Sequence, residues 1–228
     1  MKAIRFFALL IFGFVVAQGQ VATRRPSVRA TGDATIMSVP DQAKVSFAVE
    51  TRAASAQDAA TQNAGITTAV IAAVKSVLGS GGDVQTTGYS LNAVYTYPSN
   101  GGQGQLTGFT ASNIAEATLT NLSQVGKLID TGVQAGATRV QSLAFSLKDP
   151  EPIRLQALRQ ATILARTHAD AMANGAGLKM GTVISIIEGA TSTPVVYFNV
   201  PTAAATTPIV PGTVTTSATV TMELEIIP

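Results

Sequence analysis

The chain has 228 residues, of which 46% are hydrophobic and only 12% are charged, against about 25% charged residues in an average soluble domain. It contains no cysteine, which excludes disulfides, thiol nucleophiles and metal sites built from cysteine. Its single histidine, His168, excludes any metal site that needs two or three histidines from one chain. The length is sufficient for a hydrophobic core in one domain or in two small ones.

The first 20 residues have the features of a secretory signal peptide. Lys2 and Arg5 precede an uncharged run over 6–17. The small residues that end at Ala17 suit cleavage after Ala17, and those that end at Gly19 offer a second cleavage site. Twelve helical residues rise about 18 Å, whereas the bilayer core is about 30 Å thick, so cleavage is favoured over a membrane anchor. The sequence therefore predicts a signal peptide over 1–17, or up to 19, followed by an exposed linker over 18–26 and a folded domain over 27–228.

Loss of this segment changes the charge balance. Of fifteen basic residues, Lys2 and Arg5 leave with the signal peptide, so thirteen remain against thirteen acidic residues. Without a basic surplus the mature chain does not attract a phosphate backbone, and nucleic acid is not an expected partner. A chain with no net charge also has little self-repulsion, which favours association between its copies.

Alternating apolar and polar residues predict two strands at the start of the domain, over 27–37 and 43–49. Pro40 and Asp41 between them predict a tight turn, so the two strands are expected to form a hairpin. The remaining strands are predicted over 84–97, 106–119, 140–147, 183–187, 194–200 and 214–227, with the segment 194–200 the weakest of them.

Three segments have the pattern of helices. The first, over 55–78, begins with Ser55 as its N-cap and ends at a run of glycines. The second covers 123–135, and the third follows Asp149 and Pro150, a pair typical of a helix start. The order β-β-α-β-β-α-β-α-β-(β)-β predicts an α+β fold, with antiparallel β-sheets on which three helices pack, either as one unit or as two lobes that meet near Asn121.

The residues that could carry chemistry form no catalytic constellation. We expect His168 to be a packed or interfacial histidine, because it lies on a predicted apolar stripe of the third helix that contains Ile153, Ala157, Ala161, Leu164 and Met172. A Ser–His–Asp site needs an exposed serine on a sharp turn, and the G-x-S-x-G motif is absent from the sequence. Glu223 and Glu225 share one face of the last strand and are expected to form cross-strand ion pairs. The sequence therefore predicts no enzymatic activity, no metal and no cofactor.

Two groups of residues are candidates for binding. The first is a set of basic residues along the third helix, which either face solvent or contact another subunit: Arg154, Arg159 and Arg166. The second is a set of aromatic residues beside the glycine-rich loop over 98–104, which would form the mouth of a ligand pocket, with Tyr197 as a further member: Tyr89, Tyr95 and Tyr97.

Several of these segments resemble the SIMPL-domain family. The first, VRATGDATIMSVPDQAKVSFAVET (28–51), has the Gly-x-(Gly/Ala) strand, the Pro-Asp turn and the V-x-F-x-V-E-T strand that recur in that family. The further matches follow in order along the chain: TTGYSLNAVY (86–95), LTGFTASN (106–113), VGKLIDTGVQAGATRVQSLAFSLKDPE (125–151), RQATILARTHADAMANGAGLKMGTVISIIEG (159–189) and TPIVPGTVTTSATVTMEL (207–224).

The resemblance implies an α+β fold, a signal peptide and a location in the periplasm or at the outer membrane. Some members are described as oxidative-stress defence proteins or immunogenic envelope antigens, and some assemble into large rings or channel-like oligomers. The resemblance brings no catalytic residue and no cofactor. We therefore expect an exported, non-enzymatic envelope protein, periplasmic, secreted or peripherally associated with the outer membrane, that self-assembles as a homo-oligomer and contributes to stress defence. The alternative is a periplasmic protein that binds a small molecule or a peptide.

Overall fold

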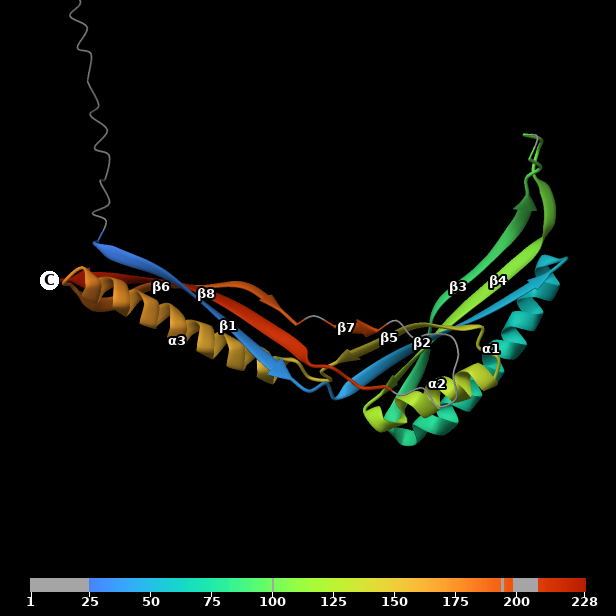
Figure 1. The fold of residues 1–228 in the computed structure, drawn as a ribbon, viewed down its shortest axis with the longest axis horizontal. Helices are drawn as coiled ribbons and strands as arrows, with labels where there is room; N and C mark the ends of the chain where they lie inside the picture. The colour runs from blue at the N-terminus through green and yellow to red at the C-terminus, as the bar shows by residue number, and fades with distance from the viewer. Residues whose placement is uncertain (1–24, 100, 194, 199–208) are drawn as a thin grey trace, which may run out of the picture.

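The computed structural model describes residues 25–99, 101–193, 195–198 and 209–228. The predicted signal peptide and most of the linker over 18–26 lie outside the described residues. The described chain forms an elongated molecule with two lobes, each of which is an antiparallel sheet with helices on one face (Figure 1).

The larger lobe contains a five-stranded sheet in the order β3-β4-β2-β5-β7, covered by α1 and α2. A single 3₁₀ turn follows α1 at Gly79–Gly81, and another precedes α2 at Leu122–Gln124. The elements of this lobe are β2 (Gln42–Ala53), α1 (Ala56–Leu78), β3 (Gly82–Thr96), β4 (Gln105–Leu119), α2 (Val125–Gln134), β5 (Arg139–Ser146) and β7 (Val196–Phe198).

The smaller lobe contains a three-stranded sheet in the order β1-β8-β6, with α3 lying across it (Figure 1). Its elements are β1 (Ser27–Ser38), α3 (Glu151–Gly175), β6 (Lys179–Ser192) and β8 (Val214–Ile227). All paired strands in both lobes are antiparallel. The predicted α+β fold, with antiparallel sheets and three helices, is confirmed.

The predicted hairpin between the first two strands is wrong. β1 pairs with β8 at the far end of the chain, with Ser27 opposite Glu225, whereas β2 pairs with β4 and β5. The two strands run end to end (Figure 1), and the buried Pro40 and the exposed Asp41 lie in the short connection between them. The backbone N–H of Asp41 donates to the carbonyl of Ser146, which anchors the link to the larger lobe. The segment with Pro40 and Asp41 therefore connects two sheets instead of closing one hairpin.

The two lobes are not consecutive halves of the chain. Asn121 lies inside the larger lobe, between β4 and α2. The chain passes between the lobes four times: after β1, after β5, after β6 and after β7. Each lobe has its own cluster of buried apolar side chains, so the lobes are assembled by pairing of distant segments.

The core of the larger lobe is formed around two fully buried aromatic rings, Phe47 of β2 and Phe145 of β5. Leu128 of α2 and Val70 and Val74 of α1 are buried in the same cluster. The segment that consists of α1 and the turn after it is long and apolar enough to cross a membrane, judged by length and composition only. Helices in the core of a folded protein can have the same length and composition. The buried stripe of α1 packs on this sheet through Val70, Val74 and Leu78.

Gly132 of α2 lies directly against the ring of Phe47. A Cβ atom at this position would lie 2.8 Å from Cδ1 and 2.9 Å from Cζ of that ring. Because Phe47 is fully buried, its ring has little room to move, and we expect Gly132→Ala to lower the free energy of unfolding by about 2 kcal/mol. Urea denaturation of the two proteins measures the difference.

A second substitution tests whether the ring is the cause. Phe47→Leu removes the ring atoms that the new methyl group would meet, so the double variant is expected to lose less stability than the two single variants together. Strictly additive losses would show that Gly132 is required for another reason.

The smaller lobe is held together by alanines. Every fourth residue of α3 is a buried alanine facing β1 and β8: Ala157, Ala161, Ala165, Ala169 and Ala173. The predicted stripe is right at Ala157 and Ala161. It is wrong at Leu164, His168 and Met172, because Leu164 is 38% and Met172 45% exposed and His168 is also exposed. Only small side chains fit here, since the backbone of α3 approaches β1 closely at Gly32.

Two predicted helix starts have the expected hydrogen bonds. The Ser55 hydroxyl accepts the backbone N–H of Asp58 at 3.1 Å, which confirms Ser55 as the N-cap of α1. The Asp149 carboxylate accepts the N–H of Glu151 at 3.1 Å, at the first residue of α3. Both side chains satisfy helical N–H groups that have no partner inside the helix.

Candidate functional site

The outer edge of β6 is the candidate site. β6 is the last strand of its sheet, paired with β8 on one side, and no strand within the described ranges pairs with its other side. An edge strand presents a row of backbone N–H and C=O groups that can pair with another strand. At 14 residues β6 is long for an edge strand.

The side chains of β6 make this edge strongly apolar. Ile186 lies opposite Met222, on the side that faces α3, whereas Ile187 lies opposite Thr221 on the other side. Apolar side chains are therefore exposed on both faces of the strand. The exposed fractions are 42% for Val183, 45% for Ile184, 55% for Ile186 and 57% for Ile187.

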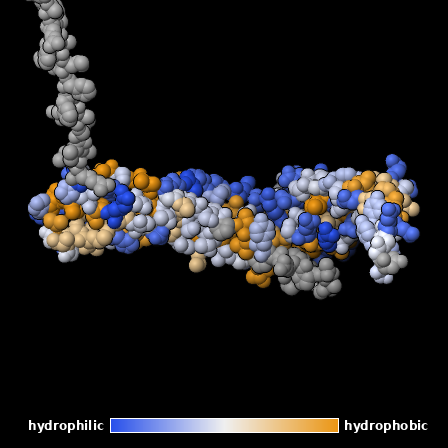
Figure 2. Space-filling view, turned by 90° about the horizontal axis from the view of Figure 1, so that it is seen from above, coloured by the Kyte–Doolittle hydropathy of each residue, from blue (hydrophilic) through white to orange (hydrophobic). Residues whose placement is uncertain are grey.

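α3 leaves these side chains uncovered because it lies over β1 and β8. Seen from above, the surface of the smaller lobe, at the left of the view, mixes apolar and hydrophilic residues (Figure 2). Charged residues and prolines commonly protect an edge strand from other chains. Between Lys179 and Ser192, β6 has no proline and only one charged residue besides Lys179, which is Glu188.

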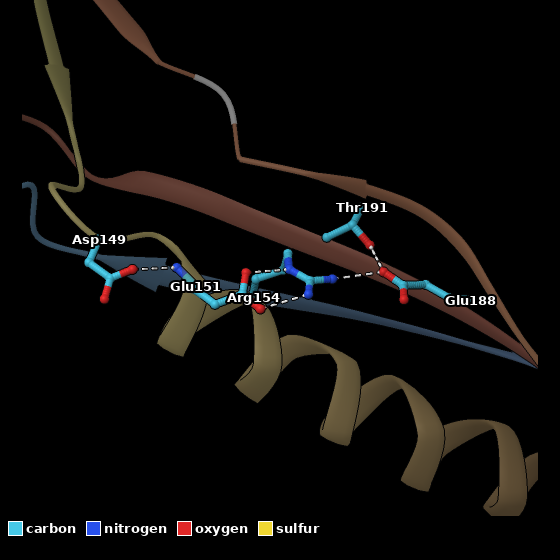
Figure 3. Close-up of polar contacts among 5 residues, drawn as sticks. All are labelled: Asp149, Glu151, Arg154, Glu188 and Thr191. Atoms are coloured by element: carbon cyan, nitrogen blue, oxygen red, sulfur yellow. Dashed lines mark hydrogen bonds and ion pairs between the residues drawn. The ribbon is translucent and has the colours of Figure 1, made fainter.

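Glu188 is already ion-paired within the chain (Figure 3). The Arg154 guanidinium donates to both carboxylate oxygens of Glu151 at 2.7 Å and to Glu188 Oε1 at 2.8 Å. Thr191 donates to the same Glu188 oxygen at 3.0 Å. Arg154 thus ties the start of α3 to β6 and offsets the charge of the carboxylate closest to the apolar segment.

The hydrogen bonds between Arg154 and Glu151 stabilise the charged form of each group. The guanidinium lowers the pKa of the Glu151 carboxyl, and the carboxylate raises the pKa of Arg154. A carboxyl with a lowered folded-state pKa stabilises the protein above its unfolded pKa, near 4.5, and this stabilisation is lost as pH falls through the folded-state value.

The pair is expected to make a small, pH-dependent contribution to stability. Glu151→Gln should lower Tm slightly at pH 7, and the difference from the parent protein should disappear as the pH is reduced well below 4.5. Thermal unfolding at several pH values measures this, with Asp170→Asn on the same helix as the control, because Asp170 makes no ion pair in the described part of the chain. A difference in Tm that stays constant down to low pH would contradict the assignment.

The other two arginines predicted as interface residues are exposed. Arg159 and Arg166 make no ion pair among the described residues, and the four-residue spacing of Arg166 and Asp170 does not bring their charges together. The structure therefore uses Arg154 within the chain and leaves Arg159 and Arg166 facing solvent. Their contact with a second subunit stays a prediction.

The predicted cross-strand pairs of the last strand are present. Arg29 donates to Glu223 at 2.8 Å, and Arg25 lies 3.7 Å from Glu225.

His168 is not buried, but its Nδ1 lies 2.8 Å from the Thr31 carbonyl oxygen, so the ring ties α3 to β1. Within the described ranges no three His, Asp or Glu side chains gather as they would around a metal ion.

The tyrosines lie in two separate places. Tyr89 and Tyr95 are on β3 and Tyr97 follows its last residue, within the projecting β3–β4 hairpin (Figure 1). Their exposed fractions are 57% for Tyr89, 50% for Tyr95 and 73% for Tyr97. Tyr197 is on β7, at the opposite end of the strand order, with three strands between β7 and β3. The structure therefore does not bring the four rings to one mouth, and the ligand-binding alternative stays a prediction.

Together the fold and the open edge define a two-lobed α+β protein with an apolar strand at the edge of one sheet. The chain belongs to the SIMPL family, described as proteins of unknown function (DUF541), whose family model matches residues 28–224. The resemblance seen in the sequence is thereby confirmed.

Its relatives are bacterial. The chain is 28% identical over 174 residues to the 26 kDa periplasmic immunogenic protein of Brucella melitensis biotype 1, covering 75% of this chain and 70% of the relative. It is 29% identical over 185 residues to the uncharacterized protein YggE of Edwardsiella ictaluri, covering 78% and 75%. It is 25% identical to YggE of Escherichia coli K12, covering 81% and 74%.

The β6 edge was not among the residues that sequence reasoning identified. The strand was predicted only over 183–187, whereas it extends over Lys179–Ser192. The signal is the segment Val183-Ile184-Ser185-Ile186-Ile187, in which apolar residues do not alternate with polar ones. Such a run indicates a strand covered on both faces, but here the chain itself covers neither face fully.

Proposed function

We propose that this protein is an exported, non-enzymatic component of the periplasm whose working form is an assembly of copies of the same chain. The observation that carries the proposal is the edge of β6, where four large apolar side chains are 42% to 57% exposed and one row of backbone groups has no strand partner in the described structure. The proposal includes peripheral association with the outer membrane and a contribution to defence against oxidative stress.

Export is supported by two observations. The first 20 residues have the charge and hydrophobicity of a signal peptide that would be cleaved after Ala17 or Gly19. The Brucella relative is named a periplasmic protein. A chain without cysteine also suits an oxidising compartment, because it has no thiol to be oxidised there.

Self-assembly is supported by the energetics of the exposed strand. Contiguous exposed apolar surface is unfavourable in water by roughly 25 cal/mol per Å², and an association that covers it removes this cost. The mature chain has equal numbers of acidic and basic residues once the signal peptide is removed, so long-range repulsion between copies is weak.

The stress role rests on the family resemblance and is assigned to the assembly, since the chain has no cysteine for redox work. A strain that lacks the protein is complemented with the parent chain or with a variant that does not assemble, and survival in hydrogen peroxide is compared. Only the parent chain is expected to restore survival. Equal protection by the non-assembling variant would separate the stress role from assembly.

The mass of the secreted mature protein in solution tests the central claim. Light scattering after size exclusion is expected to give a defined multiple of the chain mass that persists on dilution to micromolar concentrations. A protein that stays monomeric at high concentration would refute self-assembly.

A further inference from the structure

We propose that the β3–β4 hairpin is the surface through which this protein contacts a phospholipid bilayer, with its exposed tyrosines in the headgroup region. This inference rests on the peripheral membrane association that the proposed function includes, and it names the segment that meets the lipid. Its basis is a projecting hairpin in which 32 consecutive residues, 84–115, include no charged residue (Figure 1).

The hairpin extends beyond the other elements of the larger lobe. β2 ends at Ala53, opposite Phe109, so beyond this point the sheet consists of β3 and β4 only. α1 begins at Ala56, close to the end of β2, and runs back along the sheet, so it does not cover the outer part of the hairpin (Figure 1). The outer part is therefore accessible to a surface that approaches along the strands.

The exposed side chains of the hairpin divide into an apolar and a polar face. Successive residues of a strand point to opposite faces, so Tyr89, Leu91 and Tyr95 share one face of β3. The register shift beside Tyr95 adds an extra residue to β4, not to β3, so this alternation is unbroken, and Leu106 lies opposite Tyr95 on the same face. The opposite face carries exposed polar residues without charge: Ser90, Asn92, Thr96 and Gln105.

Tyrosine is the main residue of the apolar face toward the tip. Tyr97, which is 73% exposed, follows two residues after Tyr95, and its ring lies over Gly104, where an added Cβ atom would be 2.7 Å from Cε1. Leu106 is 52% exposed. Tyrosine is enriched at the membrane–water interface because its ring is apolar and its hydroxyl bonds water or a headgroup. The side chains near the tip therefore suit the headgroup region.

The absence of charge distinguishes this hairpin from an ordinary exposed strand. At the 12% frequency of the whole chain, 32 residues would include about four charged residues. Exposed edge strands are commonly protected by charges, yet β3, an edge strand, has none after Asp83. The segment 189–222 is also uncharged, but it contains β8, a central strand with alternate side chains buried. Since charged side chains are costly within a bilayer, an exposed hairpin without them is suited to lipid contact.

The backbone of the hairpin limits the depth of this contact. Among the described residues, the outer side of β3 and the part of β4 beyond Phe109 have no further strand partner. Unpaired N–H and C=O groups are excluded from hydrocarbon but can bond water and headgroups. Arg52 donates to the hydroxyl of Thr107 at 3.3 Å, and a single basic residue provides little attraction to anionic lipid. We therefore expect a shallow contact that depends weakly on salt and on lipid charge.

Flotation of the purified mature protein with vesicles tests the contact. Vesicles of phosphatidylcholine, alone or mixed with phosphatidylglycerol, are expected to bind the parent protein to a similar extent at low and high salt. The double variant Tyr95→Ser/Tyr97→Ser should lower the partition coefficient by about tenfold or more, because binding scales with the apolar area that enters the interface. Tyr197→Ser is the matched control, since Tyr197 on β7 is also 73% exposed, and it should bind as the parent does.

A charge placed on either face tests which face meets the lipid. Leu106→Glu puts a carboxylate on the apolar face and is expected to lower the partition coefficient by about tenfold or more. Gln105→Glu puts the same charge on the neighbouring exposed residue of the polar face, and its binding to phosphatidylcholine vesicles should stay within about twofold of the parent. Circular dichroism and Tm of each variant establish that the fold is retained.

The absence of tryptophan from the chain allows the depth of the hairpin to be measured. Tyr97→Trp provides a single indole whose emission is expected to shift to shorter wavelength when phosphatidylcholine vesicles are added. Lipids brominated near the headgroup should quench this emission more than lipids brominated near the end of the acyl chain. Tyr197→Trp is the control and should show neither the shift nor the quenching.

The outcomes distinguish this inference from the proposed function. If the parent protein binds vesicles and Tyr95→Ser/Tyr97→Ser binds equally well, the hairpin contact is refuted and peripheral association stands. Binding only to anionic vesicles, or an equal loss in Tyr197→Ser, also refutes the hairpin contact. If the parent protein binds neither kind of vesicle, the contact and the peripheral association are both refuted, and self-assembly is decided separately by the mass in solution. Selective loss in the hairpin variants, together with shallow quenching at Tyr97→Trp, supports the inference.

Discussion

Replacement of Gly32 with valine is expected to separate α3 from β1 and to unfold the smaller lobe first. A Cβ atom at Gly32 would overlap the carbonyl oxygen of Ala161 and the backbone nitrogen of Ala165. Both are backbone atoms of a long helix, so no side-chain rotation can relieve the overlap. We expect a loss of about 3 kcal/mol or more in the free energy of unfolding.

For a domain of this size that loss corresponds to a decrease in Tm of about 6–12 °C. Thermal unfolding followed by circular dichroism measures it. Thr35→Val on the same strand is the control, because Thr35 is exposed and valine is well tolerated in strands. An unchanged Tm for Gly32→Val would mean that α3 does not lie on β1 as described.

The same close approach explains the composition of α3. Five buried alanines at intervals of four form the contact surface, and larger apolar residues such as Ile163, which is 64% exposed, lie away from it. A large side chain at Ala161 or Ala165 would hold the helix away from Gly32. The helix and the glycine therefore form one packing unit, in which small size matters more than hydrophobicity.

The sequence predicted the elements well because their signals are local. Ser55, Asp149 and the glycines after Leu78 define the helix ends, and alternation of apolar residues defines strands such as β8, which was predicted over the range observed. These signals depend on hydrogen bonds and burial within a few residues. They require no knowledge of distant parts of the chain.

The pairing of strands could not be predicted in the same way. β1 alternates in a manner that suits pairing with β2 or with β8, and its actual partner begins at Val214, far along the chain. The buried stripe of α3 was predicted to continue from Ala161 through Leu164 and Met172, whereas the close approach at Gly32 selects alanine along the whole face. The open edge of β6 depends on the strand order, which local patterns do not determine.

Asn63 of α1 holds together two strands of the larger lobe. Its side-chain amide is fully buried and donates to the carbonyl of Val49 on β2 at 2.8 Å and to the carbonyl of Ala111 on β4 at 3.0 Å. Its own oxygen accepts the hydroxyl of Thr67, one turn further along the helix, at 3.3 Å. All three polar contacts are thus satisfied inside the core, where an unmatched group would be costly.

Asn63→Asp keeps the shape of this side chain and removes both donors. At pH 7 the carboxylate would face two carbonyl oxygens in the core, and we expect a loss of about 4 kcal/mol in the free energy of unfolding. Asn92→Asp is the control, since Asn92 is exposed on β3. Urea denaturation at pH 7 is expected to separate the two variants clearly.

The loss should depend on pH with a definite sign. Burial and the facing carbonyls raise the pKa of the new carboxyl in the folded protein above its unfolded value of about 3.9. Between these values the folded state binds more protons, so stability falls as pH rises through this range and is then constant. The variant should therefore recover part of its stability relative to Asn92→Asp at about pH 4, because the protonated carboxyl can donate one hydrogen bond. Equal stability of the two variants at pH 7, or a loss that does not change with pH, would contradict the role of the Asn63 amide as a double donor.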